Sequence, residues 1–120
     1  MSRPRERPYT ARVSEARTLY REGFQHFAQG RLAEAIASYR RAVESDPALA
    51  IAWNGLSIAL QRSGDLDAAI EAGRRLIELE PDDPLSHTNL SILYQSVGMV
   101  PEAEDEMAIA TRLQARQEGS

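Results

Sequence analysis

The sequence predicts an all-α fold made of tandem helix-turn-helix hairpins, about six helices in total. Three observations lead to this prediction: a repeat of 34 residues, apolar positions at helical spacing within each repeat, and glycines or prolines where helices would end or begin. The strict apolar-polar alternation that is typical of half-buried strands is absent from the sequence.

The period of 34 is visible in several columns at once. The recurring positions are Gly30, Gly64 and Gly98; Ala35, Ala69 and Ala103; Leu32, Leu66 and Val100; and Pro47 and Pro81. An ungapped comparison of residues 31–47 with residues 65–81 gives seven identities in 17 positions. A period of this length indicates stacked structural units that contact their neighbours, rather than one enclosed core.

The first hairpin is expected to pair helices 15–29 and 32–45. Gly30 lies where a helix should close in a left-handed conformation, which glycine adopts without steric cost. The second helix carries an apolar stripe at i, i+3, i+4 and i+7 spacing. The stripe consists of Leu32, Ala35, Ile36, Tyr39, Ala42 and Val43.

The remaining helices have capping signals of the same kind. The expected ranges are 49–62, 66–79, 84–97 and 101–117. The pairs Asp46-Pro47 and Asp83-Pro84 place an acidic cap before a proline, which the first turn of a helix tolerates. Six helices then form three antiparallel hairpins.

Composition excludes several functional classes. The 120 residues include no cysteine, and the formal charge is −4. Residues 1–60 hold nine arginines and six acids (+3), whereas residues 61–120 hold five arginines and twelve acids (−7). A net-acidic chain argues against general nucleic-acid binding, and we read the arginine-rich N-terminus as a solvated arm.

The chain is also expected to be cytoplasmic, with no membrane partner. Its longest apolar run, residues 48–53, is far shorter than the roughly 20 residues that span a bilayer. The basic N-terminus is not followed by the apolar stretch that a secretory signal needs.

These columns resemble the tetratricopeptide repeat family, whose unit has 34 residues. The second unit is nearest to the family pattern at its start, with Trp53, Leu56 and Ser57. Matching residues of the other units are Leu19, Gly23, Gly30, Ala35, Tyr39, Ala42 and Pro47, and Leu90, Ser91, Tyr94, Gly98, Ala103 and Ala110. The departures include His87 in the column of Trp53, and Gly73 in the column of Tyr39 and Met107.

The resemblance implies a right-handed superhelical solenoid and a division of the chain. Residues 1–15 would form a short basic arm, residues 16–117 one domain of three repeats, and residues 118–120 a tail. The expected repeats are 16–49, 50–83 and 84–117.

The resemblance also implies a concave groove lined by the first helix of each repeat. The groove residues it implies are Arg17, Tyr20, Phe24, Phe27, Ile51, Asn54, Ile58, Gln61, Leu85, Thr88, Asn89, Ile92 and Gln95. Some family members hold a ligand's terminal carboxylate in a clamp of Lys, Asn and Arg. The corresponding positions here are Tyr20, Phe24, Gly55, Leu85 and Asn89, so that clamp is missing.

No catalytic constellation emerges from the residues, so we expect no cofactor, no metal and no enzymatic activity. His26 and His87 fall in columns of packed helix residues. The acids of residues 102–106 lie where a helix start favours negative charge. The pairs Arg40-Arg41 and Arg74-Arg75 have glutamates three or four residues away, which favours local ion pairs over an anion site.

The leading hypothesis is therefore a non-catalytic adaptor that binds a peptide segment of another protein. The alternative is a self-associating scaffold that uses the last helix, because its apolar residues Met107, Ile109, Ala110 and Leu113 would meet no further repeat. A small hydrolase or metal enzyme is a third hypothesis, based only on the two histidines and the many acids.

Overall fold

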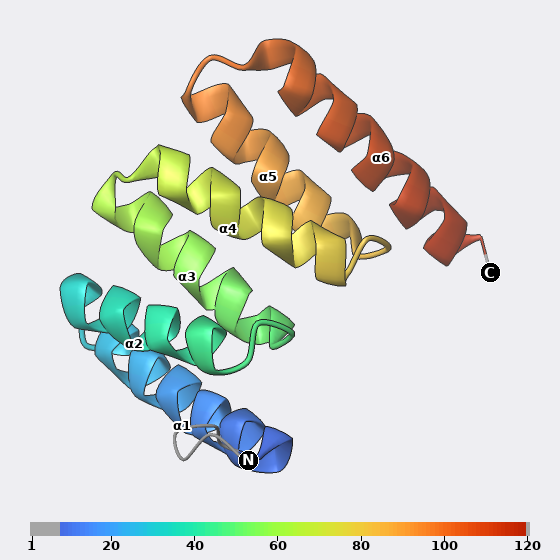
Figure 1. Ribbon diagram of the computed structural model, residues 1–120. Helices are drawn as coiled ribbons and strands as arrows, with labels where there is room; N and C mark the ends of the chain where they lie inside the picture. The colour runs from blue at the N-terminus through green and yellow to red at the C-terminus, as the bar shows by residue number, and fades with distance from the viewer. Residues whose placement is uncertain (1–7, 120) are drawn as a thin grey trace, which may run out of the picture.

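The computed structural model describes residues 8–119, and these fold into six α-helices without a strand. The helices are α1 (Tyr9–Ala28), α2 (Leu32–Ser45), α3 (Ala50–Ser63), α4 (Leu66–Leu79), α5 (Pro84–Ser96) and α6 (Val100–Glu118). Consecutive helices form antiparallel hairpins that stack along the long axis, so that α1 and α6 lie at opposite ends (Figure 1). The all-α repeat architecture predicted from the sequence is confirmed.

The predicted helix bounds agree closely with the structure, except at the N-terminus. The second and fourth helices span 32–45 and 66–79, as predicted. However, α1 begins at Tyr9, six residues earlier than predicted, so residues 9–15 of the expected arm are helical. Residues 1–7 of that arm and residue 120 lie outside the described residues. Helix α1 also contacts the next hairpin through α3.

The three glycines of the repeat follow the first helix of each hairpin, where a helix end was predicted. Gly30, Gly64 and Gly98 have φ values of 77°, 87° and 80°, in the left-handed region. Any side chain would be strained there, because a Cβ atom is disfavoured at positive φ.

Of the two expected Asp-Pro helix caps, one is present and the other is not. Asp83 caps α5 as predicted, since its carboxylate accepts from the Leu85 amide at 3.1 Å and Pro84 is the first helical residue. The expectation for Asp46-Pro47 is wrong, because α3 begins only at Ala50. Asp46 instead closes α2 and accepts from the Ala48 amide at 3.1 Å, so it stabilises the turn.

The core is built where the helices approach each other through small residues. Ala35, Ala69 and Ala103 are fully buried. Two serines of the neighbouring column donate to the carbonyls of these alanines: Ser57 to Ala69 at 2.9 Å and Ser91 to Ala103 at 2.7 Å. The hydroxyls therefore join the helices of the second and third hairpins where the backbones are close.

The outer face of α6 is more polar than the sequence indicated. Ala110 and Leu113, expected to lie uncovered, are buried at 3% and 7% exposure. In addition, two columns that are buried or half-buried in α2 and α4 become exposed and polar in α6. These columns are Ile36, Ile70 and Glu104, and Val43, Ile77 and Thr111. Of the four residues expected to form an apolar face, only Met107 is exposed.

Candidate functional site

The hollowed face of the molecule is lined mainly by α1, α3 and α5. Four of the large apolar residues with high exposure belong to the predicted groove: Phe24 at 55%, Ile51 at 49%, Leu85 at 68% and Ile92 at 43%. Exposed apolar side chains that gather on one face mark a surface suited to contact with a partner.

Three cavities that share lining residues bring most of the predicted groove residues together. Asn54 lines all three, which have volumes of about 110, 110 and 310 Å³. The first contains Tyr20, Phe24, Phe27 and Ile58, the second Gln61 and Asn89, and the third Ile51 and Leu85. Thr88 lines a neighbouring pocket. Arg17, Ile92 and Gln95 line none of these cavities.

Tyr39 forms the floor of the groove at its N-terminal end. The residue is 2% exposed, and its ring packs 5.7 Å from the ring of Tyr20, centroid to centroid. Burial and the neighbouring Tyr20 raise the pKa of Tyr39 to about 12. The ring fits only because Gly23 and Gly55 lack side chains: a Cβ atom at either position would lie 2.7 or 2.8 Å from it.

Sequence reasoning missed the acidic end of the groove. Glu80 and Asp83 line the cavity that contains Ile51 and Leu85. A larger pocket of about 860 Å³ adjoins it, between the turn after α4 and the C-terminal end of α6. The signal was the excess of acids in the second half of the chain, but the repeat pattern did not place them at one edge.

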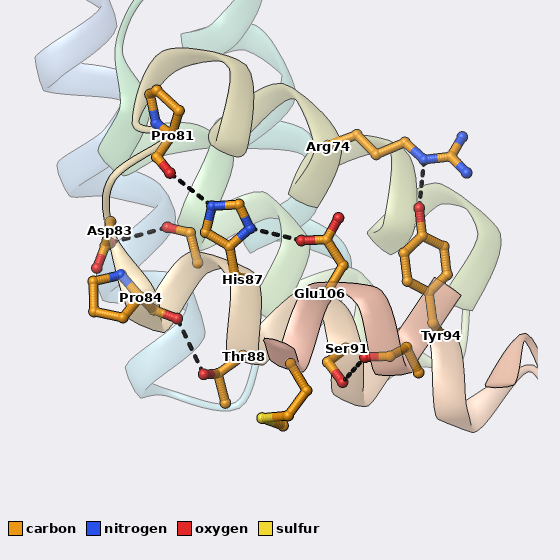
Figure 2. A network of polar contacts seen from close by, with 12 residues as sticks. Arg74, Pro81, Asp83, Pro84, His87, Thr88, Ser91, Tyr94 and Glu106 are labelled. Carbon is orange, nitrogen blue, oxygen red and sulfur yellow. Dashed lines mark hydrogen bonds and ion pairs between the residues drawn. The ribbon is translucent and has the colours of Figure 1, made fainter. Parts of the chain in front are cut away.

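One of the local ion pairs predicted for the arginine pairs is confirmed, at Arg75, whereas Arg74 bonds to a residue of α5. Arg75 forms an ion pair with Glu78 at 2.6 Å and lies 5.5 Å from the Trp53 ring centroid. The Arg74 Nε atom donates to the Tyr94 hydroxyl at 2.8 Å (Figure 2). This hydrogen bond raises the pKa of Arg74 above its usual value.

His87 is a buried structural residue, whereas His26 is half-buried. The His87 Nε2 atom lies 2.7 Å from the Pro81 carbonyl oxygen, and Nδ1 lies 2.6 Å from the Glu106 carboxylate (Figure 2). The carbonyl only accepts, so Nε2 must donate. The Nδ1 atom faces the Glu106 carboxylate, so the ring links α5 to α6.

The second repeat explains why a histidine stands in the column of Trp53. The Trp53 Nε1 atom donates to the Pro47 carbonyl at 2.8 Å, and His87 makes the equivalent bond to Pro81, 34 residues later. The histidine therefore keeps the bond to the preceding turn and adds a link to α6. Both ring nitrogens are occupied by structural partners, which argues against a catalytic role.

None of the helices of residues 8–119 combines the length and apolarity of a membrane span. In the same range, no group of three or more His, Asp or Glu residues is placed to hold a metal ion.

Comparisons with known proteins identify the repeat. A family described as tetratricopeptide repeat matches residues 20–84, which is more than half of the chain. The curated proteins searched include none that matches.

Solved structures share the fold at low sequence identity. A crystal structure of MamA superposes with a TM-score of 0.85 at 22% identity, over 90% of this chain and 63% of that one. A CopN-Scc3 complex gives 0.79 at 24%, over 82% and 58%. The first TPR of Spaghetti (RPAP3), bound to the HSP90 peptide SRMEEVD, gives 0.80 at 18%, over 86% and 82%. This chain thus spans less than two thirds of the MamA and CopN-Scc3 chains that it matches.

Proposed function

Because the chain belongs to the tetratricopeptide repeat family, we propose that it is a non-catalytic interaction module that binds an extended or helical segment of a partner protein. The segment lies along the hollow face of α1, α3 and α5. The observation that carries this proposal is the exposure of four large apolar side chains on the predicted groove columns, Phe24, Ile51, Leu85 and Ile92, of which the first three line the cavities of this face.

The groove chemistry supports a peptide ligand. Phe24 and Ile58 offer apolar contact beside the Tyr39 floor. Asn54 and Asn89 lie along the same face and offer amide groups that can pair with a ligand backbone. Apolar anchors surrounded by such polar groups are the usual composition of binding sites of this type.

The ligand that we expect is less acidic than the peptide bound in one of the similar structures. The first TPR of Spaghetti is bound to SRMEEVD, a peptide with three acidic residues. The positions that correspond to a carboxylate clamp hold Tyr20, Phe24, Gly55, Leu85 and Asn89 here, none of them basic. An acidic carboxyl-terminal peptide is therefore not the ligand we expect.

The test compares two double variants as baits for partners in a lysate of the source cells. Phe24→Glu with Leu85→Glu places two charges in the groove, at side chains that are already exposed. The control, Val100→Glu with Met107→Glu, changes two exposed apolar residues of α6, outside the groove. We expect the groove variant to lose the partner and the control to retain it, with unchanged circular dichroism for both. Partner capture that is equal in all three proteins would disprove the groove assignment.

A further inference from the structure

The pocket between the turn after α4 and the end of α6 is large, acidic and partly apolar. Its volume is about 860 Å³, and its charged lining residues are Glu80, Asp82, Asp83 and Glu118. Leu79, Pro81, Pro84 and Leu85 add apolar surface, and Leu85 is 68% exposed. The pocket therefore combines negative charge with uncovered apolar contact area.

Most of these carboxylates have no cationic partner among the described residues. Within residues 8–119, Glu80, Asp82 and Glu118 form no ion pair, and no arginine lines the pocket. Asp83 differs from them because it caps α5 through the Leu85 amide and the Ser86 hydroxyl. A ligand with several positive charges would thus meet three carboxylates that are free of ion pairs.

The chain itself contains a segment of matching chemistry. Residues 3–8 read Arg-Pro-Arg-Glu-Arg-Pro, with three arginines and two prolines. Proline restricts both itself and the residue before it to extended conformations. Such a segment loses little conformational entropy on binding, and its prolines can contact Pro81, Pro84 and Leu85 while the arginines approach the acids.

A single chain is poorly arranged to fill its own pocket. Helix α1 contacts α3, whereas α5 packs against α4 and α6. From α1 to α5 there are thus two helix spacings, roughly 16–20 Å. Arg7 and Arg5 stand one and three residues before Pro8, so their Cα atoms lie within about 4 and 10 Å of it. The arginines of one arm therefore cannot enter the pocket of the same chain together.

We propose that the arginine-rich N-terminal segment, residues 3–8, of one copy occupies the acidic pocket of a second copy. The contact is head-to-tail, because each copy offers one segment and one pocket at different places. Head-to-tail contacts form open chains unless their rotation closes a ring. Self-association then uses the acidic pocket rather than the outer face of α6. The contact does not depend on the proposed groove ligand.

The first experiment measures association of the full chain by sedimentation velocity as concentration and salt vary. We expect assemblies that grow with concentration at about 0.01 M salt, where the Debye length is about 30 Å. At about 0.1 M salt the Debye length is about 10 Å, and the dissociation constant should rise about tenfold or more. A protein that stays monomeric at millimolar concentration and low salt would overturn the proposal, and a segment bound in its own pocket would give that result.

The second experiment uses two variants that each lose one half of the contact. The segment variant carries Arg3→Ser, Arg5→Ser and Arg7→Ser. The pocket variant carries Glu80→Gln, Asp82→Asn and Glu118→Gln, and it keeps the cap residue Asp83. Each variant alone should be monomeric, whereas an equal mixture should form a dimer that does not grow, since only one segment and one pocket remain functional.

The matched control removes three exposed acids elsewhere. Glu34→Gln, Glu44→Gln and Asp105→Asn change the net charge by the same amount as the pocket variant, on α2 and α6. We expect this control to assemble as the wild type does. Equal loss in the control and the pocket variant, or a mixture that stays monomeric, would show that the pocket is not the docking site.

Discussion

At the scale of single residues, the three hairpins pack their paired helices in different ways at the column of Gly23, Ser57 and Ser91. Ser57 and Ser91 join their paired helices through hydroxyl bonds to Ala69 and Ala103. The first hairpin has Gly23 in that column and places the Tyr39 ring there instead. The ring then fills the space beneath the groove, so one substitution in the repeat gives this end of the groove an aromatic floor.

This difference predicts opposite effects for the same substitution at two glycines. Gly23→Ala should lower the free energy of unfolding by about 2 kcal/mol, because its Cβ atom would lie 2.7 Å from the Tyr39 ring. Gly73→Ala should raise it by about 0.5–1 kcal/mol, because the nearest atom, the Leu90 Cδ1 atom, is 3.4 Å away and alanine favours helix. Urea unfolding of both variants measures the effects. Equal destabilisation would contradict the packing described for Gly73.

The repeat columns could be predicted from the sequence, but several contacts between their residues could not. The period of 34 and the small residues are visible in the sequence, so the helices and the close approaches could be predicted. The contact of Tyr39 with Gly55 could not be predicted, because it depends on the distance between two hairpins. The repeat columns do not indicate that distance. The same holds for Glu106, which reaches the buried His87 from a different helix.

At the scale of helices, His87 links α5 to α6 and to the turn that precedes α5. His87→Phe removes both bonds and leaves the Glu106 carboxylate, 19% exposed, without its partner. We expect a loss of about 3 kcal/mol, because an unpaired charge at a partly buried site is costly. Adding Glu106→Leu should recover much of this loss. Additive losses in a double-mutant cycle, measured by urea unfolding, would mean that the two residues do not interact.

Helix α6 differs from α2 and α4 on its outer face, and this difference is also testable. Glu104 and Thr111 stand where the earlier helices have isoleucine or valine. Glu104→Ile with Thr111→Val should restore an apolar face next to the exposed Met107. We expect the variant to associate at about 1 M salt, where charge contacts are screened, and the wild type to be monomeric under the same condition. Light scattering measures this, and a monomeric variant would show that the polar residues do not limit association.

At the scale of the whole molecule, helices contact chiefly their neighbours along the stack, apart from the contact of α1 with α3. Stability then depends on the units and on the interfaces between them, rather than on one enclosed centre. The cavities of the groove follow from this arrangement, since Asn54 of the middle hairpin lines all three of them. The middle hairpin therefore supports both the fold and the proposed site.

The stacked arrangement predicts a gradient of local stability. The hairpin of α3 and α4 has a neighbour on each side, whereas the two end hairpins have a neighbour on one side within the described chain. Native-state hydrogen exchange should therefore show the slowest amides in α3 and α4, and faster exchange by local opening in α1 and α6. His87→Phe should speed exchange in α5 and α6 much more than in α2, because its bonds lie within the last hairpin and the turn before it. Uniform acceleration along the chain would instead indicate a single cooperative unit, in which the groove could not adapt at one end while the other stays folded.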